Sequence, residues 1–244
     1  MSDAKVEIDR MTKSFGAVDA VANVTLKVEG GEVYGLLGGN GAGKTTVLKA
    51  TVGIVHPSSG SVRIGGVDTR SPDVYRTLRA AGYLPQTPVL YDHLTGREFL
   101  RFVAALYGVG GAAFRQVEAL TDEMEMGASI DHPIRSYSLG MKRRIGLLAA
   151  IVHSPDYLFL DEPTASLDDE AIFALEGMIR RCRDRGGLIL IATHRMESLG
   201  GMFDRVAVLK KGRLDFEGSP EAFRVSAGHR RLKGGNVVER GVRV

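Results

Sequence analysis

Short apolar segments recur along the chain, and their patterns predict two kinds of strand. Residues 6–8 and 24–28 alternate apolar and polar side chains, which is typical of half-buried strands, and residues 61–64 predict another strand. Other runs are apolar without a polar face, as expected for strands inside a parallel sheet. These runs are residues 33–37, 157–160 and 188–191.

The stretch from residue 87 to residue 144 is expected to be entirely helical. Apolar residues recur at helical intervals over residues 97–107, and a second helix is expected after the glycines that follow. We therefore predict that residues 87–144 are a helical insertion. The α/β core that it interrupts would consist of residues 1–86 and 145–222.

The α/β pattern resumes after the insertion. Helices are predicted over residues 145–152 and 170–183. Because they alternate with the buried strands, a mostly parallel sheet is expected. Residues 205–209 and 214–216 predict two edge strands joined by a lysine–glycine turn.

Composition narrows the class of protein. The 244 residues are 44% apolar and 25% charged, which are ordinary globular values and exclude a disordered chain. A single cysteine excludes a disulfide scaffold. The longest apolar run, residues 145–152, is far shorter than the ~20 residues that a bilayer span needs. The charged start of the chain predicts no signal peptide, and a net charge of +3 is too small to favour nucleic acid as a partner.

Residues 223–244 are predicted to form a basic C-terminal tail. The last twenty residues carry five arginine and lysine residues against one acid, Glu239. Two interpretations stay open for this tail. It is either a solvated terminus or a segment attracted to an anionic membrane surface.

A glycine-rich segment lies between the first buried strand and a predicted helix. It matches the pattern G-x-x-x-x-G-K-[ST], in which backbone N–H groups point at one anion and the lysine reaches the outer phosphates of a nucleotide. Thr45 offers a hard oxygen to Mg²⁺, and the start of the helix adds positive partial charge. A glycine-rich turn that matches by chance is the alternative. The predicted nucleotide-binding residues are Gly38, Gly39, Asn40, Gly41, Ala42, Gly43, Lys44, Thr45 and Thr46.

Two carboxylates, Asp161 and Glu162, end the next buried strand along the chain after the insertion. Ligands of doubly wound sheets bind at such strand ends. We expect Asp161 to hold Mg²⁺ and Glu162 to act as general base or to position an attacking water. The alternative is that both acids only cap the helix that follows.

Five segments together resemble the ATPase subunit of ABC transporters. They are GGNGAGKTT (38–46), Gln86 after GYLP, YSLGMKRR (137–144), LFLDEPTASLD (158–168) and IATH (191–194), and they occur in the family's order. The resemblance covers about residues 3–222. It implies a P-loop NTPase core with a mostly parallel sheet, an N-terminal antiparallel β subdomain and an inserted all-α subdomain. It also implies hydrolysis of ATP with Mg²⁺.

The resemblance assigns roles around the chain's own nucleotide. Lys44, Glu162, His194 and Gln86 are the implied catalytic residues: His194 contacts the γ-phosphate, and Gln86 contacts Mg²⁺ and the water. The implied metal ligands are Thr45, Gln86 and Asp161. Phe15 is implied to stack on adenine, although a core aromatic at a strand end is the alternative. A lone histidine such as His194 is more often structural, but its place directly after a buried strand favours a role at the site.

The signature segment, residues 137–141, is implied to act on the nucleotide of a second subunit. Ser138 supplies a hydroxyl and Gly140 a backbone N–H for the phosphate. Asp168 lies in a loop that contacts the same partner. Two other positions of the segment depart from the family's usual residues, and the variant resembles the drug and antibiotic exporter branch.

Two protein partners follow from the resemblance. One is a second copy of this chain or a homologous ATPase subunit, and the other is a multi-span membrane permease on a separate chain. Tyr91 and Leu94 are candidate contacts with the permease, unless they close the insertion's own small core. The implied function is ATP-driven export from the cytoplasmic face of the cell membrane. The alternative is a soluble ATPase of an iron–sulfur assembly or scaffold complex.

Overall fold

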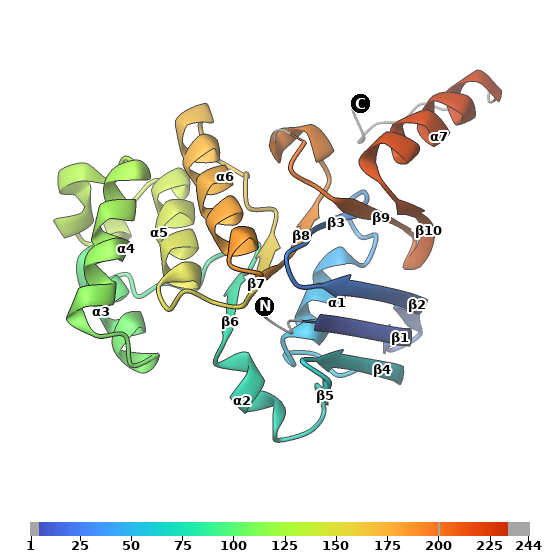
Figure 1. Ribbon diagram of the computed structural model, residues 1–244, viewed down its shortest axis with the longest axis horizontal. Helices are drawn as coiled ribbons and strands as arrows, with labels where there is room; N and C mark the ends of the chain where they lie inside the picture. Colours follow the sequence, from blue (N-terminus) through green and yellow to red (C-terminus); the bar gives the residue numbers. More distant parts are fainter. Residues whose placement is uncertain (1–4, 200, 234–244) are drawn as a thin grey trace.

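Two β-sheets form the centre of the protein, as seen in the computed structural model, which describes residues 5–199 and 201–233 (Figure 1). The strands of the antiparallel sheet are β1 (Lys5–Phe15), β2 (Val18–Glu29), β4 (Ser59–Ile64) and β5 (Val67–Asp68). The strands of the six-stranded sheet are β3 (Val33–Leu37), β6 (Ala81–Leu84), β7 (Tyr157–Asp161), β8 (Leu188–Thr193), β9 (Arg205–Lys210) and β10 (Arg213–Gly218).

The order of the strands confirms the predicted fold class. The first sheet has the order β2-β1-β4-β5, and the second has the order β10-β9-β3-β8-β7-β6. In the second sheet every pair from β9 to β6 is parallel, and only β10 runs antiparallel to its neighbour. The core is therefore an α/β core with a mostly parallel sheet, beside an N-terminal antiparallel sheet.

The six-stranded sheet is buried on both faces, which explains the apolar runs of its central strands. Tyr34, Leu36 and Phe159 belong to one apolar core, shared with α1 (Lys44–Thr51) and the antiparallel sheet. Val33 and Leu37, whose side chains point to the opposite face, belong to a second core that includes the helical part of the chain. Helix α1 thus lies between the two sheets (Figure 1).

Regular structure between residues 87 and 138 is helical. The helices after α1 are α2 (Val74–Leu78), α3 (Gly96–Leu106), α4 (Gly111–Glu123), α5 (Leu139–Ile151), α6 (Asp169–Asp184) and α7 (Pro220–Lys233). Three short 3₁₀ helices are η1 (Gly127–Asp131), η2 (Ile134–Ser136) and η3 (Met196–Leu199). Helix α3 begins at a capping box in which Thr95 and Glu98 satisfy each other's backbone N–H groups. Figure 1 shows α3, α4 and α5 together at one end of the molecule.

Several element boundaries differ from those predicted. Helix α5 runs through residues 144 and 145, so the predicted end of the insertion lies inside a helix. Helix α7 likewise crosses the predicted boundary between residues 222 and 223. Strand β9 is an interior strand, because it pairs with β3 as well as with β10, so only β10 of the two predicted edge strands lies at an edge.

Strand β6 was not predicted from the sequence. It has four residues, and Gly82 interrupts its apolar pattern. The glycine has a packing reason, since a Cβ at Gly82 would lie 2.0 Å from the carbonyl oxygen of Ala150 in α5. The close approach of β6 and α5 therefore requires glycine at position 82, and this glycine is also why the apolar pattern does not predict the strand.

The structure describes only the first half of the predicted basic tail. Residues 223–233 continue helix α7, and residues 234–244, with Glu239, lie outside the described residues. In the described part of the chain, no helix has the length and apolar character needed to cross a membrane.

Candidate functional site

The predicted site residues converge because three parallel strands end side by side. Strand β8 lies between β3 and β7. In the register, Leu37 at the end of β3 pairs with Thr193, and Asp161 at the end of β7 pairs with Ala192. The segments that follow these strands therefore meet at one edge of the sheet, as expected for a parallel α/β sheet.

The glycine-rich loop has a backbone that only glycine adopts without strain. Gly38 has φ of 153° and Gly43 has φ of 104°. A Cβ at Gly38 would lie 2.5 Å from the carbonyl oxygen of Leu209, and one at Gly43 would lie 2.5 Å from that of Ala20. The loop is thus pressed against its neighbours, and α1 begins directly after it.

Lys44 lies inside this loop. Its side chain is buried, at 6% exposure for the residue, and its Nζ donates hydrogen bonds to the carbonyl oxygens of Gly38 at 2.6 Å and Gly39 at 3.2 Å. A buried ammonium that faces a cradle of backbone groups is the arrangement that binds phosphate.

Thr45 and Asp161 form the second contact between the loop and the strand ends. The Thr45 hydroxyl donates to Asp161 Oδ2 at 2.7 Å, and Asp161 is only 1% exposed. Burial raises the pKa of the Asp161 carboxyl, and the hydrogen bond from Thr45 opposes this shift. A hydroxyl and a buried carboxylate in contact are hard oxygen donors that suit Mg²⁺. Among the described residues, no cluster of three or more His, Cys, Asp or Glu side chains could hold a metal ion.

Glu162 has its carboxylate fixed from several sides. Oε2 accepts from the Thr193 hydroxyl at 3.1 Å and lies 2.9 Å from Nδ1 of His194. Oε1 lies 3.5 Å from Nζ of Lys44. The backbone of Glu162 has φ of 50°, a left-handed conformation that is costly for a residue with a Cβ. The strained backbone and these contacts fix the Glu162 carboxylate beside Lys44 of the glycine-rich loop.

The structure contradicts the alternative that these two acids cap a helix. Helix α6 begins at Asp169, and its N-cap is Asp168, whose side chain accepts from the N–H of Ala171. Neither Asp161 nor Glu162 occupies a capping position.

Phe15 is the last residue of β1, and its side chain is 55% exposed. The alternative that it is a core aromatic is therefore wrong. The ammonium of Lys13 lies 5.1 Å from the centre of its ring. Because the ring is exposed, a planar ligand can reach it, and adenine stacking stays a prediction.

Gln86 follows β6. Its backbone is bound by the side chain of Arg143, a residue to which sequence analysis gave no role. Arg143 of α5 donates to the carbonyl oxygens of Pro85 at 3.0 Å and Gln86 at 2.7 Å. Burial lowers the pKa of the Arg143 guanidinium, while the negative charges of Asp161 and Glu162 oppose the shift. The pair of arginines directly after the signature segment was the available signal.

The signature segment lies at the start of α5, and the hydrogen bonds described for Lys44, Thr45 and Glu162 do not include it. Ser138 is the N-cap of α5, and its Oγ accepts from the N–H of Met141 at 3.2 Å. Leu139 next to it is 77% exposed. The hydroxyl and the first backbone N–H groups of this helix are therefore at the surface, where a second molecule can reach them.

The two candidate contacts with a permease differ. Tyr91 is 47% exposed, and its ring packs edge-on against Phe102 at 5.5 Å between centres. Leu94 is half-buried and packs against the larger apolar core. Leu94 thus packs against the core that the helical part shares with the six-stranded sheet, whereas Tyr91 presents part of its ring to solvent.

Comparison with known proteins places this arrangement in a family. Residues 21–165 match the sequence profile of the family described as "ABC transporter". The chain is 37% identical over 224 residues to "Nod factor export ATP-binding protein I" of Paraburkholderia xenovorans (strain LB400), covering 91% of this chain and 73% of that protein. It is 34% identical over 230 residues to "Daunorubicin/doxorubicin resistance ATP-binding protein DrrA" of Streptomyces peucetius, covering 93% of this chain and 69% of that protein.

The fold agrees with the sequence likeness. A solved structure described as "Structure of ATP binding subunit of ABC transporter" superposes with a TM-score of 0.82 at 31% identity. The superposition covers 93% of this chain and 94% of the other. The two kinds of likeness thus extend over nearly the same length of chain.

Proposed function

Because this chain belongs to the ABC transporter family of ATP-binding proteins, we propose that it is the subunit that binds and hydrolyses ATP to drive export through a separate membrane permease. One observation carries the chemistry. The Glu162 carboxylate lies within ion-pairing distance of Lys44 and within hydrogen-bonding distance of His194, which come from two other segments. Side chains arranged in this way can catalyse the transfer of a phosphoryl group from a nucleotide to water.

ATP binding uses the glycine-rich loop and α1. The loop's backbone N–H groups and the start of the helix surround the phosphates, and the ammonium of Lys44 moves from its carbonyl partners to the outer phosphate oxygens. Thr45, Asp161 and Gln86 would hold Mg²⁺, which when bound neutralises charge on the phosphates.

Hydrolysis uses Glu162 and His194. The Glu162 carboxylate orients the attacking water and accepts its proton, and its direction is set by the Thr193 hydroxyl and the His194 ring. His194 also contacts the γ-phosphate. Because Glu162 and Thr193 are buried, the electrostatic contacts of the carboxylate are stronger than they would be in water.

Two subunits act together in this proposal. Ser138 and Gly140 at the exposed start of α5 bind the γ-phosphate held by a second copy or a homologous subunit. ATP therefore joins two subunits head to tail, and hydrolysis releases them. The differential binding needed to move such a pair from 1:99 to 99:1 is ~5.5 kcal/mol.

We predict that Phe15 stacks on adenine. Phe15→Ala should weaken ATP binding by ~1–3 kcal/mol, because stacking of a base on an aromatic ring contributes that much. Phe15→Tyr keeps the ring and should bind ATP as the parent does. Titration calorimetry of both variants is the measurement, and equal affinities in Phe15→Ala and the parent would refute the assignment.

Export requires a membrane partner at the cytoplasmic face, and Tyr91 is our candidate contact. A tagged chain purified from detergent-solubilised membranes should carry a multi-span permease. Tyr91→Ser should lose this partner, whereas Tyr75→Ser, which alters an exposed ring on α2, should keep it. Recovery of an iron–sulfur assembly scaffold in place of a permease would contradict the export proposal and support the alternative.

A further inference from the structure

Two consecutive arginines of α5, Arg143 and Arg144, are buried, at 6% and 8% exposure. A buried guanidinium is costly unless its donors find partners. The Nη groups of the two side chains find partners in different loops, whereas Nε of Arg144 has no hydrogen-bond partner among the described residues. Arg143 reaches the Gln86 segment, and Arg144 reaches the loop that connects Glu162 to α6.

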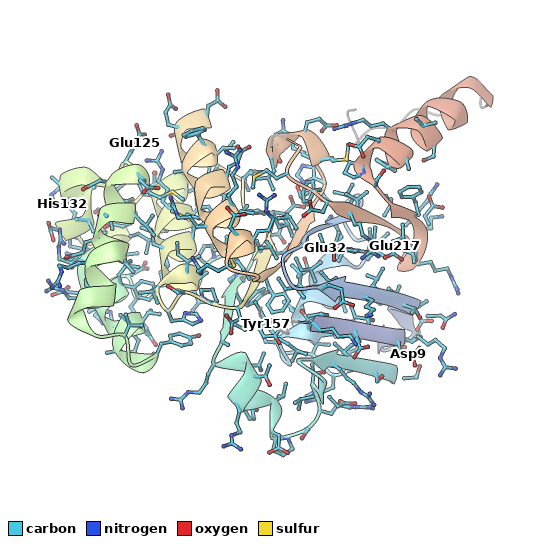
Figure 2. All side chains as sticks on the ribbon, in the orientation of Figure 1. Asp9, Glu32, Glu125, His132, Tyr157 and Glu217 are labelled. Atoms are coloured by element: carbon cyan, nitrogen blue, oxygen red, sulfur yellow. The ribbon has the colours of Figure 1, made fainter. Side chains whose placement is uncertain are left out.

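Arg144 joins three segments of the chain. Its Nη1 donates to the carbonyl oxygen of Met124 at 2.8 Å and lies 3.7 Å from Oε2 of Glu125, which Figure 2 labels in the helical part of the molecule. Its Nη2 forms an ion pair with Oδ2 of Asp168. One side chain thereby connects α5, the turn after α4 and the start of α6.

The loop of residues 163–168 contacts α5 at a second point. A Cβ at Gly140 would lie 2.7 Å from the carbonyl oxygen of Ser166, so the first turn of α5 rests directly on the loop. The Asp168 carboxylate contacts two helices. Its Oδ1 accepts from the N–H of Ala171 in α6, and its Oδ2 pairs with Arg144 of α5. Only five residues lie between Glu162 and Asp168, so a displacement of Asp168 is readily transmitted to Glu162.

We propose that Arg144 is a positioning residue for ATP turnover. Through Asp168 it holds the loop of residues 163–168, and with it Glu162, in a fixed place relative to Ser138. In the proposed function, on which this inference rests, Ser138 touches the partner's nucleotide and Glu162 touches the chain's own. A rigid connection between them aligns Glu162 when the second subunit closes. Misplacement of such a group by ~1 Å can cost about 10²-fold in rate.

Two substitutions separate this role from helix capping and from bulk stability. Asp168→Asn keeps a good N-cap for α6 but removes the charge that faces Arg144. Arg144→Lys keeps the positive charge but loses the planar fork that reaches two segments at once. The matched control is Arg97→Lys, which disturbs a comparable ion pair with Asp131, 2.7 Å away, inside the helical insertion.

The experiment measures ATP turnover and amide hydrogen exchange in each variant. We expect kcat to fall by about 10- to 100-fold in Asp168→Asn and in Arg144→Lys. KM for ATP should stay within about twofold, because neither substitution removes a contact that the chain makes with its own ATP. Without nucleotide, hydrogen exchange of the backbone amides of residues 164–168 should speed up by about 10-fold, since the loop opens more easily. The double variant should lose no more than the worse single one, and Arg97→Lys should behave as the parent.

Parent-like kcat in both variants, or unchanged exchange in the loop, would overturn the role of Arg144. A rise in KM that accounts for the whole loss would also overturn it, because Arg144 would then act on binding. A parent protein that hydrolyses no ATP would contradict the proposed function. The exchange data would in that case still decide whether Arg144 holds the loop.

Discussion

Glu162→Gln should reduce ATP turnover by about 10²–10⁴-fold, the usual contribution of a positioned acid–base group. The amide keeps the size of the side chain and can still accept from the Thr193 hydroxyl, but it is no longer a basic carboxylate. ATP binding should survive, since Lys44, Thr45 and Asp161 are unchanged. Phosphate release at saturating ATP and a binding titration together give the two values.

The matched control for this substitution is Glu170→Gln, which alters an acid in the first turn of α6. It should change stability by no more than about 1 kcal/mol and leave turnover unchanged. If Glu162→Gln hydrolysed ATP at the parent rate, Glu162 would have no part in catalysis.

Lys44→Ala should abolish tight ATP binding. Truncating one partner of a buried, hydrogen-bonded charge pair costs about 2–5 kcal/mol, so Kd for ATP should rise by on the order of 10²-fold or more. Lys49→Ala, at the other end of the same helix, is the control and should bind ATP normally. Calorimetric titration of both variants decides the matter, and parent-like affinity in Lys44→Ala would remove the phosphate-binding role from the loop.

The sequence predicted the fold class well because the buried strands are strongly patterned. Runs such as residues 33–37 and 188–191 are apolar on both faces, as expected for strands in the interior of a covered parallel sheet. Strand β6 was missed because the glycine that lets α5 pack closely also breaks the apolar run. Helix ends were less predictable, since a helix such as α5 begins at its N-cap, Ser138, rather than at a change in apolar spacing.

Within the site, local motifs were readable and long-range contacts were not. The spacing of Gly38, Lys44 and Thr45 predicts a phosphate loop, and the structure places it beside Asp161 and Glu162. The hold of His194 and Thr193 on Glu162 depends on the register of β7 and β8, which no local pattern encodes. The ion pair between Arg144 and Asp168 likewise joins residues of two separate motifs, 24 positions apart, and neither motif predicts it by itself.

The structure also changes how Ser138 should be tested. Replacing Gly140 would press a side chain against Ser166 of the same chain, and Ser138→Ala would remove the N-cap of α5. Ser138→Asp retains a good N-cap and places a negative charge where the partner's phosphate would bind. This variant therefore separates the cap from the contact between subunits.

The central claim is that ATP joins two of these chains through the signature segment. The most direct test is the molar mass of Glu162→Gln, measured by light scattering with and without ATP and Mg²⁺. The account predicts the mass of one chain without nucleotide and of two chains with it, and the mass of one chain under both conditions when Ser138→Asp is added. A Glu162→Gln protein that binds ATP yet keeps the mass of a single chain would contradict the account.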